Sequence, residues 1–484
     1  MTALLLLMLA SAQSSQATTG ELRLVVHDAS GAPVHASVEL VSAANRFDEM
    51  LETDDDGVLV ARRLPFGEYV VRVTRDGFAP HASPIELRSA LPLEQMVTLN
   101  VAPVEAQVTV TPAEVLIDPR QTSTVHRLGA TALQQRFTAL PGRSLPDLVN
   151  TQPGWLLEAN GVLHPRGSEY QTQYVLDGLP FADNRSPAFA PELDVDDVRA
   201  MSILTGGYPA EYGRKLGGII EVASGGEARR GFHGSAVGSI GSFSSRTGDA
   251  TAAYTWQRTT LGVAAGLTGT ARYLDPPVEE NFTNHGTTSH VTVRAERQLT
   301  DLDRLSAAVR YGDANVLVPN ELLQQQAGQR QQRDSHETSG QFAYQRVLSS
   351  SVVADVRAMV RDLAAGLTSN ALSTPIAANQ ARGLTDVYLK ATASARLGAH
   401  DVKWGGDASS GTVDEAFNYV LTNRRAFDRD TPRQFAFADS RNDREQSLFV
   451  QDSVSSGPWT VNAGLRWDHY ALVVDDTAVS PRLS

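Results

Sequence analysis

Residues 227–484 consist largely of segments in which apolar and polar side chains alternate, and this pattern constrains the fold more than any other feature of the chain. In WTVNAGLRWD (459–468), every odd position is apolar and most even positions are polar. The segments VTVRAERQL (291–299), RLSAAVRYG (304–312) and DVYLKATASARL (386–397) repeat this period of two. Successive side chains point to opposite faces of a β-strand, so the pattern predicts long strands with one apolar and one polar face.

The alternation fits either a soluble antiparallel sheet with one wet face or a transmembrane barrel whose apolar face meets lipid. The length of the strands, their terminal aromatic residues and the spacing of the connections favour the barrel. Residues 299–303 and 455–458 have the length of periplasmic turns, whereas 317–337 and 418–443 are long and polar, as outer loops are. The glutamine run within 324–332 is interpreted as part of an exposed loop.

The pattern yields ten to twelve strands, whereas the wide transmembrane barrels whose lumen holds a separate domain have about 22. An open half-barrel would leave backbone groups unpaired in lipid, at a cost of several kcal/mol each. We therefore expect residues 227–484 to be the first half of an antiparallel transmembrane barrel, truncated within it.

The composition excludes several classes of protein. The chain of 484 residues has a net charge of −13 and no cysteine, which argues against nucleic-acid binding and excludes disulfides and cysteine-ligated metals.

Leu4 to Ala10 is an apolar run too short to span a bilayer. Because small-residue cleavage patterns follow it, residues 1–17 are predicted to be a signal peptide, although no basic residue precedes the run; a buried N-terminal strand is the alternative.

Residues 20–101 carry short alternating segments separated by turn residues, which predicts a small antiparallel β-sandwich. The acidic residues Glu52, Asp54 and Asp56 do not fit a calcium loop, since position twelve would be Arg63. The motifs DASGAPV, TDDDG and LPFGEYVVRV resemble those of the carboxypeptidase regulatory-like domain. That resemblance implies a seven-stranded, carbohydrate-binding-like sandwich, usually without catalytic activity.

Residues 102–118 contain few turn glycines and several prolines, and are interpreted as an extended linker. Val108, Thr109 and Val110 alternate as a strand does, so this stretch either adds to the edge of another sheet or serves only as a connector.

Residues 119–226 predict a small α+β domain. Ser144 and Asp147 form a capping-box pattern for a helix that ends near Asn150, and a second short helix is predicted over 195–200. Asp177 and Gly178 stand between apolar runs, which is a hairpin signal.

The order of motifs in this region resembles the plug domain of TonB-dependent outer-membrane receptors. The motifs are LPGRSLPDLV, an Arg-Gly pair, YVLDGLPF, VRAMSILTGGYPAEYG and GGIIEVAS, and five ordered landmarks are far more specific than any single one. The landmark residues are Arg166, Gly167, Asp177, Gly178, Arg199, Tyr212, Gly213, Gly217 and Gly218. The resemblance implies that Arg166 and Arg199 face glutamates of the barrel wall, although Ser202 replaces the usual plug glutamate.

The resemblance also implies partners and a location. It places the protein in the outer membrane of a Gram-negative type bacterium, in contact with lipid, a scarce small ligand and the periplasmic TonB protein. The candidate coupling box, at which TonB would pair, comprises Gln107, Val108, Thr109, Val110 and Thr111. The expected function is energy-coupled uptake of a siderophore, vitamin or glycan; the alternative is a secreted or surface carbohydrate-binding protein or adhesin.

Enzyme signatures are missing from the sequence. It contains no H-E-x-x-H, G-x-S-x-G or phosphate-binding-loop motif. We therefore expect no catalytic residues, no metal site and no cofactor, and a mainly β fold: a β-sandwich, a small α+β plug and half of a barrel.

Overall fold

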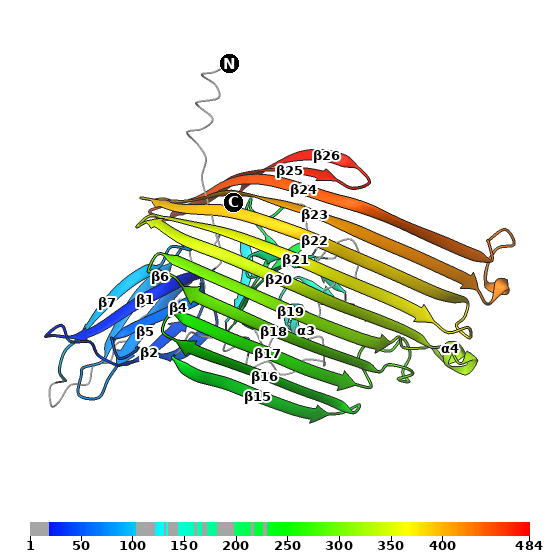
Figure 1. Ribbon diagram of the computed structural model, residues 1–484, viewed down its shortest axis with the longest axis horizontal. Helices are drawn as coiled ribbons and strands as arrows, with labels where there is room; N and C mark the ends of the chain where they lie inside the picture. Colours follow the sequence, from blue (N-terminus) through cyan, green and yellow to red (C-terminus); the bar gives the residue numbers. More distant parts are fainter. Residues whose placement is uncertain are drawn as a thin grey trace, which may run out of the picture.

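The computed structural model describes residues 19–102, 122–129, 132–133, 144–158, 162–166, 172–181, 198–213, 217–225 and 230–484. Within these ranges the chain is mainly β, as predicted, and forms an N-terminal sandwich, an inner domain and a long curved wall of strands (Figure 1). The predicted signal peptide, the candidate coupling box and Gly167 lie outside the described residues.

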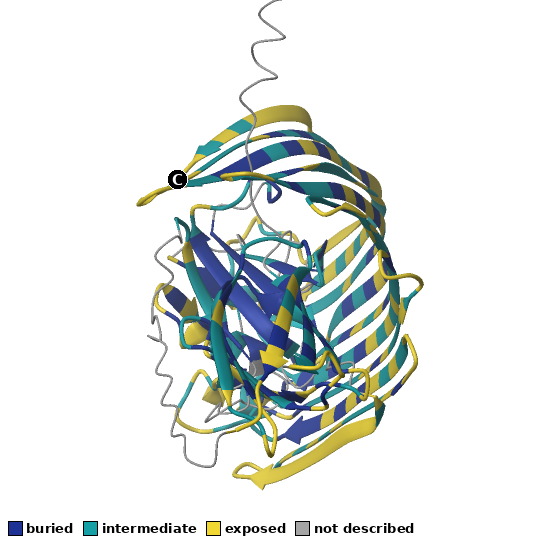
Figure 2. Ribbon diagram, turned by 90° about the vertical axis from the view of Figure 1, so that its left-hand side faces the viewer, coloured by how far each residue is buried: buried dark blue, intermediate teal, exposed yellow. Residues whose placement is uncertain are grey.

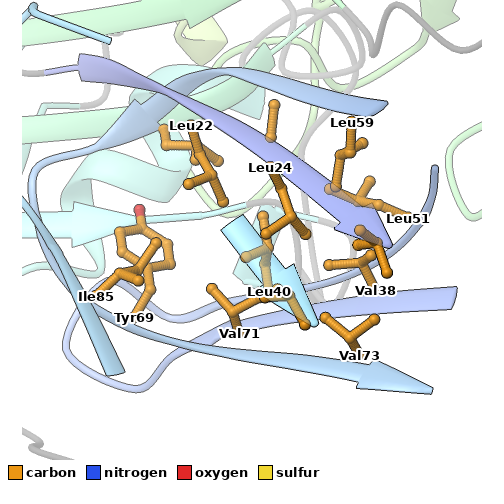
Figure 3. Close-up of a cluster of buried hydrophobic side chains, with 14 of the residues drawn as sticks. Leu22, Leu24, Val38, Leu40, Leu51, Leu59, Tyr69, Val71, Val73 and Ile85 are labelled. Atoms are coloured by element: carbon orange, nitrogen blue, oxygen red, sulfur yellow. The ribbon is translucent and has the colours of Figure 1, made fainter. Parts of the chain in front are cut away.

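The sandwich consists of seven strands in two sheets, in agreement with the expected strand number. One sheet has the order β4-β1-β7 and the other the order β3-β2-β5-β6. The strands are β1 (Thr19–Asp28), β2 (Ser37–Ser42), β3 (Phe47–Glu52), β4 (Val58–Pro65), β5 (Gly67–Thr74), β6 (His81–Leu87) and β7 (Leu93–Leu99). Leu22, Leu24, Leu40 and Val71 are fully buried between the sheets (Figure 3). The sandwich therefore has an apolar core of its own.

The inner domain is built on a five-stranded sheet with the order β12-β11-β14-β13-β8. Its elements are β8 (Thr124–Leu128), α3 (Ser144–Asn150), β9 (Trp155–Leu157), β10 (Leu163–Pro165), β11 (Thr172–Leu176), β12 (Leu179–Pro180), β13 (Val198–Gly206) and β14 (Gly218–Ser224). The predicted helix near Asn150 and the hairpin turn at Asp177 and Gly178 are both present, the turn with φ of 50° and 81°.

The helix predicted over 195–200 is wrong in its described part. Val198 and Ala200 belong to β13 and pair with β14, because backbone pairing within the sheet overrides the local capping signal.

The wall is a twelve-stranded antiparallel sheet in which each strand pairs with the next along the chain. The strands are β15 (Gly231–Gly241), β16 (Ser245–Trp256), β17 (Thr259–Thr270), β18 (Gly286–Gln298), β19 (Asp303–Leu317), β20 (Gln331–Ser349), β21 (Val352–Ser369), β22 (Ile376–Leu397), β23 (His400–Leu421), β24 (Gln434–Ser456), β25 (Trp459–Ala471) and β26 (Asp475–Leu483). Among the described residues, β15 and β26 are the two edges of this sheet. Figure 2 shows that the sheet curves around the inner domain as an incomplete barrel.

The two ends of the wall differ in the length of their connections. At one end, hereafter the short-turn end, the connections are 257–258, 299–302, 350–351, 398–399 and 457–458. The opposite, long-loop end carries the longer connections 271–285, 318–330 and 422–433. This asymmetry matches the predicted pattern of periplasmic turns and outer loops, and the sandwich lies at the short-turn end (Figure 1).

The long loops are shorter than predicted. The predicted loops over 317–337 and 418–443 shrink to 318–330 and 422–433, because their flanks are strand. Strands β22 to β24 have 22 or 23 residues, about twice the number that a tilted barrel strand needs to cross the apolar band. Beyond that band both faces of a strand meet water, so the contrast between apolar and polar positions that signals a strand is weaker in the sequence.

The glutamine run is not simply an exposed loop. Gln324 to Gln326 lie in the helix α4 (Leu322–Ala327), and the side chain of Gln329 is buried and donates to Asn320 Oδ1 at 3.2 Å. Local hydrogen bonding therefore gives the loop a fixed structure.

The outer face of the wall is apolar and the inner face is charged. Val293 and Leu389 both expose 51% of their surface on the outer face. Lys403 and Arg466, on the inner face, expose only 5% each because they contact the inner domain. This arrangement is expected for a sheet with lipid outside and a filled, polar interior. Among the described residues, no helix has the length and apolarity needed to cross a bilayer.

Candidate functional site

The inner domain is attached to the wall mainly through two of its turns. The first, residues 208–213, presents Glu211 to β22 and β23. The Glu211 carboxylate lies 2.6 Å from Lys403 Nζ and 3.3 Å from Lys390 Nζ, and all three side chains are buried. Burial opposes the ionisation of Glu211, but the two ammonium groups together outweigh it, so the pKa of this carboxyl lies below its ordinary value.

The backbone of the same turn is also bound by the wall. Arg466 donates to the Glu211 carbonyl at 2.8 Å, and Gln451 Oε1 accepts from the Glu211 amide at 2.9 Å. Arg482 donates to the Tyr212 carbonyl at 2.8 Å. Strands β24, β25 and β26 therefore hold the main chain of the turn, while β22 and β23 hold its carboxylate.

The predicted landmarks Tyr212 and Gly213 lie within this contact. Lys390 Nζ is 5.7 Å from the centre of the Tyr212 ring, a cation–π contact, and the Tyr212 hydroxyl donates to Glu221. A Cβ atom at Gly213 would overlap the Arg466 guanidinium in its present position, so the glycine leaves room for that arginine beside the turn.

Gly217 and Gly218 lie further from the wall. The Gly217 carbonyl accepts from the Tyr208 hydroxyl at 2.6 Å, and a Cβ atom at Gly218 would collide with the Trp155 ring. These two landmarks serve packing within the inner domain rather than contact with the wall.

The second attached turn is the hairpin of Asp177 and Gly178. Arg357 donates to the Asp177 carbonyl, and Lys390 Nζ lies 3.4 Å from the Gly178 carbonyl. The Asp177 carboxylate accepts from the Ser224 amide at 2.9 Å and lies 3.6 Å from Arg294. Burial opposes ionisation here too, but Arg294 and Arg63 outweigh it and keep the pKa of Asp177 below its ordinary value.

The two landmark arginines do not occupy the expected places. Arg199 donates at 2.8 Å to Glu49, which belongs to β3 of the sandwich and not to the wall. Arg166 donates to Thr205 Oγ1 at 3.4 Å, within the inner domain. In the described structure the carboxylate that pairs with Arg199 therefore comes from the sandwich, which packs beside β13, and not from a wall glutamate.

A cluster of four aromatic rings, which the sequence analysis missed, lines the inner face of the wall near the long-loop end. It consists of Phe417, Tyr419, Phe435 and Phe437, with neighbouring ring centres 5.8–6.2 Å apart. Arg382 lies over the Phe417 ring at 4.9 Å. The odd positions of β23 share the face of Lys403, which places the cluster inside. The signal in the sequence was the pair of period-two aromatics FNY and FAF, within segments that were assigned to a loop.

A polar cavity of about 170 Å³ lies where the sandwich, the inner domain and the wall meet. The sandwich contributes Glu21 and Arg62 to its lining, the inner domain Glu211, and the wall Arg294 and Lys403. Within the described ranges, no group of three or more histidine and carboxylate side chains is arranged to hold a metal ion.

Two regions of the chain match known protein families. Residues 221–484 match the family model described as TonB dependent receptor-like, beta-barrel, and residues 21–100 match the carboxypeptidase regulatory-like domain. The TonB-dependent transporter Oar of Myxococcus xanthus is 29% identical over 195 residues, which are 39% of this chain and 18% of that protein.

Solved structures share the fold. The unliganded ferric citrate transporter FecA superposes with a TM-score of 0.60 at 11% identity, covering 75% of this chain and 60% of that one. The ferripyoverdine receptor of Pseudomonas aeruginosa gives a TM-score of 0.59 at 12% identity, covering 80% and 58%. The chain thus spans at most about 60% of the length of these proteins.

The barrel model covers more than half of the chain, and the inward charges and outward apolar side chains agree with it. The chain therefore belongs to the TonB-dependent receptor family.

Proposed function

We propose that the protein is an energy-coupled receptor of the outer membrane of a Gram-negative type bacterium, which takes up a scarce small ligand. In this proposal the ligand arrives at the long-loop end, the inner domain acts as the plug, and the path opens toward the periplasm at the short-turn end. The family to which the chain belongs consists of receptors and transporters of this kind.

The observation that carries the proposal is the chemistry of the contact between the inner domain and the wall. The turn at 208–213 and the hairpin at Asp177 are held mostly by charged side chains and backbone carbonyls. The apolar contact beside them is small, a cluster of Leu179 with Met359 and Tyr388 of the wall. Polar contacts can be exchanged for water without exposing a large apolar surface, so a domain held in this way can be moved and replaced.

The aromatic cluster supports a role in the first contact with ligand. Stacked rings beside Arg382 suit a ligand that carries flat conjugated rings or negative charge. Ferric siderophores, vitamins such as cobalamin, and glycans remain the candidate classes. The titles of the structural relatives name ferric citrate and ferripyoverdine for those proteins.

Energy coupling is assigned to the segment from Gln107 to Thr111. We expect a periplasmic TonB protein to pair with it by strand addition and to pull on the inner domain. A proline removes an amide donor and opposes strand pairing, so Val108→Pro should abolish uptake while leaving ligand binding at the long-loop end unchanged. Ala113→Pro, placed just beyond the segment, is the matched control.

The experiment measures uptake by cells that carry the full-length gene, with radiolabelled ferric siderophores, cobalamin and labelled oligosaccharides as the probes. The proposal expects at least one probe to accumulate, and its accumulation to stop with Val108→Pro or on dissipation of the proton gradient. Recovery of the native protein in the soluble fraction without detergent, or uptake that persists in both conditions, would contradict it.

A further inference from the structure

We infer that the N-terminal sandwich is a detachable cover that closes the short-turn end of the barrel, latched to the wall by Glu21 and Glu296. Figure 2 looks at this end and shows the sandwich in front of the inner domain, on the concave side of the wall. The latch is a set of ion pairs between β1 and β4 of the sandwich and β18 and β19 of the wall.

The first half of the latch is the Glu21 carboxylate of the sandwich. It lies 2.5 Å from Arg304 Nη1 of β19, and Arg23 and Arg62 of the sandwich approach it at 2.7 and 3.5 Å. Burial opposes ionisation of Glu21, but Arg304, Arg62 and Arg23 outweigh it, and the pKa of this carboxyl lies below its ordinary value. Glu21 is therefore a buried anion at the interface.

In the second half of the latch the carboxylate belongs to the wall and the arginines belong to the sandwich. Glu296 of β18 receives Arg62 Nη1 at 2.7 Å and Arg63 Nη2 at 3.0 Å, both from β4. Arg62 also donates to Gln298 at 3.2 Å. The sandwich thus contributes one carboxylate and two arginines, and the wall contributes the complementary arginine and carboxylate, so the contact specifies one orientation of the cover.

The cover is tied to the inner domain as well. Glu49 of β3 pairs with Arg199 of β13 at 2.8 Å, and the Gly129 amide donates to the Asn45 carbonyl at 2.9 Å. A Cβ atom at Gly129 would collide with the backbone of Phe47, so the two domains approach closely at this point. Because the sandwich contacts both β13 and the wall, it fixes the position of the inner domain relative to the wall.

The chemistry of the latch makes it separable. The apolar core of the sandwich lies wholly within residues 22–99 and is complete without the wall. Separation would expose charged groups, which water solvates, rather than apolar surface. Ion pairs are a weak net source of stability because desolvation offsets much of their attraction, and polar contacts between domains are commonly mobile.

Detachment has a consequence for the path along the inner face of the wall. The cavity of about 170 Å³ between inner domain and wall is bordered on the sandwich side by Glu21, Arg62 and Arg63. For transport this inference rests on the proposed function: ligand that passes the inner domain can leave only after the cover has moved. Docking of the cover is itself a property of the chain, whatever the ligand.

The test uses the absence of cysteine from the 484 residues, so that within them introduced thiols are the only labelling sites. Glu94→Cys in the sandwich, where the side chain is 80% exposed, and Ser350→Cys in an exposed wall turn carry spin labels in the full-length protein. Pulsed dipolar spectroscopy then gives the distance distribution between cover and wall. We expect a narrow, docked population in the parent and a ratio of undocked to docked molecules at least about tenfold higher in Glu296→Gln.

Two further variants make the result specific. Arg62→Gln removes one of the two pairs of Glu296 from the sandwich side, together with the contacts of Arg62 to Glu21 and Gln298, and leaves the Arg63–Glu296 pair. It should also broaden the distribution, and because the change lies in the sandwich it protects the test against misfolding of the wall. Asp301→Asn removes one carboxylate from a neighbouring wall turn, where it pairs with the exposed Arg258, and should match the parent. A narrow distribution in both Glu296→Gln and Arg62→Gln, or a broad one in the parent, would overturn the inference.

Uptake separates failure of the latch from failure of the proposed function. If the distributions behave as expected and no probe enters the cells, the cover is latched but the transport role is wrong. If Val108→Pro stops uptake while the latch variants leave the distributions narrow, the transport role stands and the latch is wrong.

Discussion

The strands of the sandwich and of the wall share the same alternation of apolar and polar side chains, but the apolar face points inward in the sandwich and outward in the wall. In the sandwich Leu22 and Leu24 of β1 are fully buried (Figure 3), as is Val26. In the wall many apolar positions, such as Val293 and Leu389, face outward, and the charged Lys403 and Arg466 are among the buried side chains. The difference teaches that alternation defines two faces of a strand, whereas the surrounding medium decides which face is inside.

The two interiors consequently depend on different interactions. The sandwich is stabilised by burial of apolar side chains, at about 25 cal/mol for each Å² removed from water. The contact between wall and inner domain depends on compensated charges, which contribute little net stability when intact and leave a costly uncompensated charge when one partner is removed. Four substitution or titration experiments test this contrast.

The largest effect is expected from Glu211→Ala. It leaves Lys390 and Lys403 buried and facing each other without a counter-charge, which should destabilise the seating of the inner domain by about 3–5 kcal/mol. The measurement is the urea concentration at which the turn at 208–213 becomes sensitive to protease in the detergent-solubilised protein. Glu94→Ala, which removes an exposed carboxylate, is the control; equal midpoints for the two variants would refute the ionic account.

The next effect concerns the core of the sandwich. Leu24→Ala should destabilise the sandwich by about 2–5 kcal/mol, because it opens a cavity in a closed apolar core. Leu389→Ala on the outer face of the wall removes the same atoms but leaves no enclosed cavity, so its effect should be clearly smaller. Denaturant unfolding followed by proteolysis of each region compares the two; similar losses would mean that the outer face is packed against protein.

An arginine introduced at an exposed apolar position should destabilise the wall much more than the sandwich. Val293→Arg should cost about 2–4 kcal/mol if the residue lies near the middle of the bilayer. Met96→Arg, on an exposed apolar position of the sandwich, should change stability by no more than about 0.5 kcal/mol. Folding into lipid vesicles, monitored by the heat-dependent shift in electrophoretic mobility, measures both. Equal tolerance at the two sites would argue against lipid contact at Val293.

The smallest effect on the seating of the inner domain is expected from changes of pH that stay above the acid range. The pKa of Glu211, of Asp177 and of Glu21 is lowered in the folded protein. Each carboxylate therefore contributes stability that is fully present above its ordinary pKa and is lost as the pH falls through its lower folded value. Protease resistance of the seated inner domain should be constant from pH 8 to about pH 6 and decline only well below about pH 4. A transition near pH 6 to 7 would point to a titrating group other than these carboxyls.

Much of the candidate site could be located in the sequence, although its role could not. Asp177, Gly178, Tyr212 and Gly213 were singled out as landmarks, and all four lie at the two turns that contact the wall. Their partners Lys390, Lys403 and Arg466 were visible only as polar members of alternating strands. Nothing local distinguishes a lysine that faces water from one that faces a carboxylate some 190 residues away in the chain.

The amino-acid sequence by itself determined the mainly β fold, the short strands of the sandwich, the hairpin at Asp177 and the long strands of the wall. These features depend on local periodicity and turn chemistry, which short segments carry. The tertiary structure alone decided that Glu49 and not a wall glutamate pairs with Arg199, that four aromatic rings converge on the inner face, and that Glu21 and Glu296 latch the sandwich to the wall. These contacts join segments far apart in the chain, and their geometry exists only once the sheet has curved and the domains have docked.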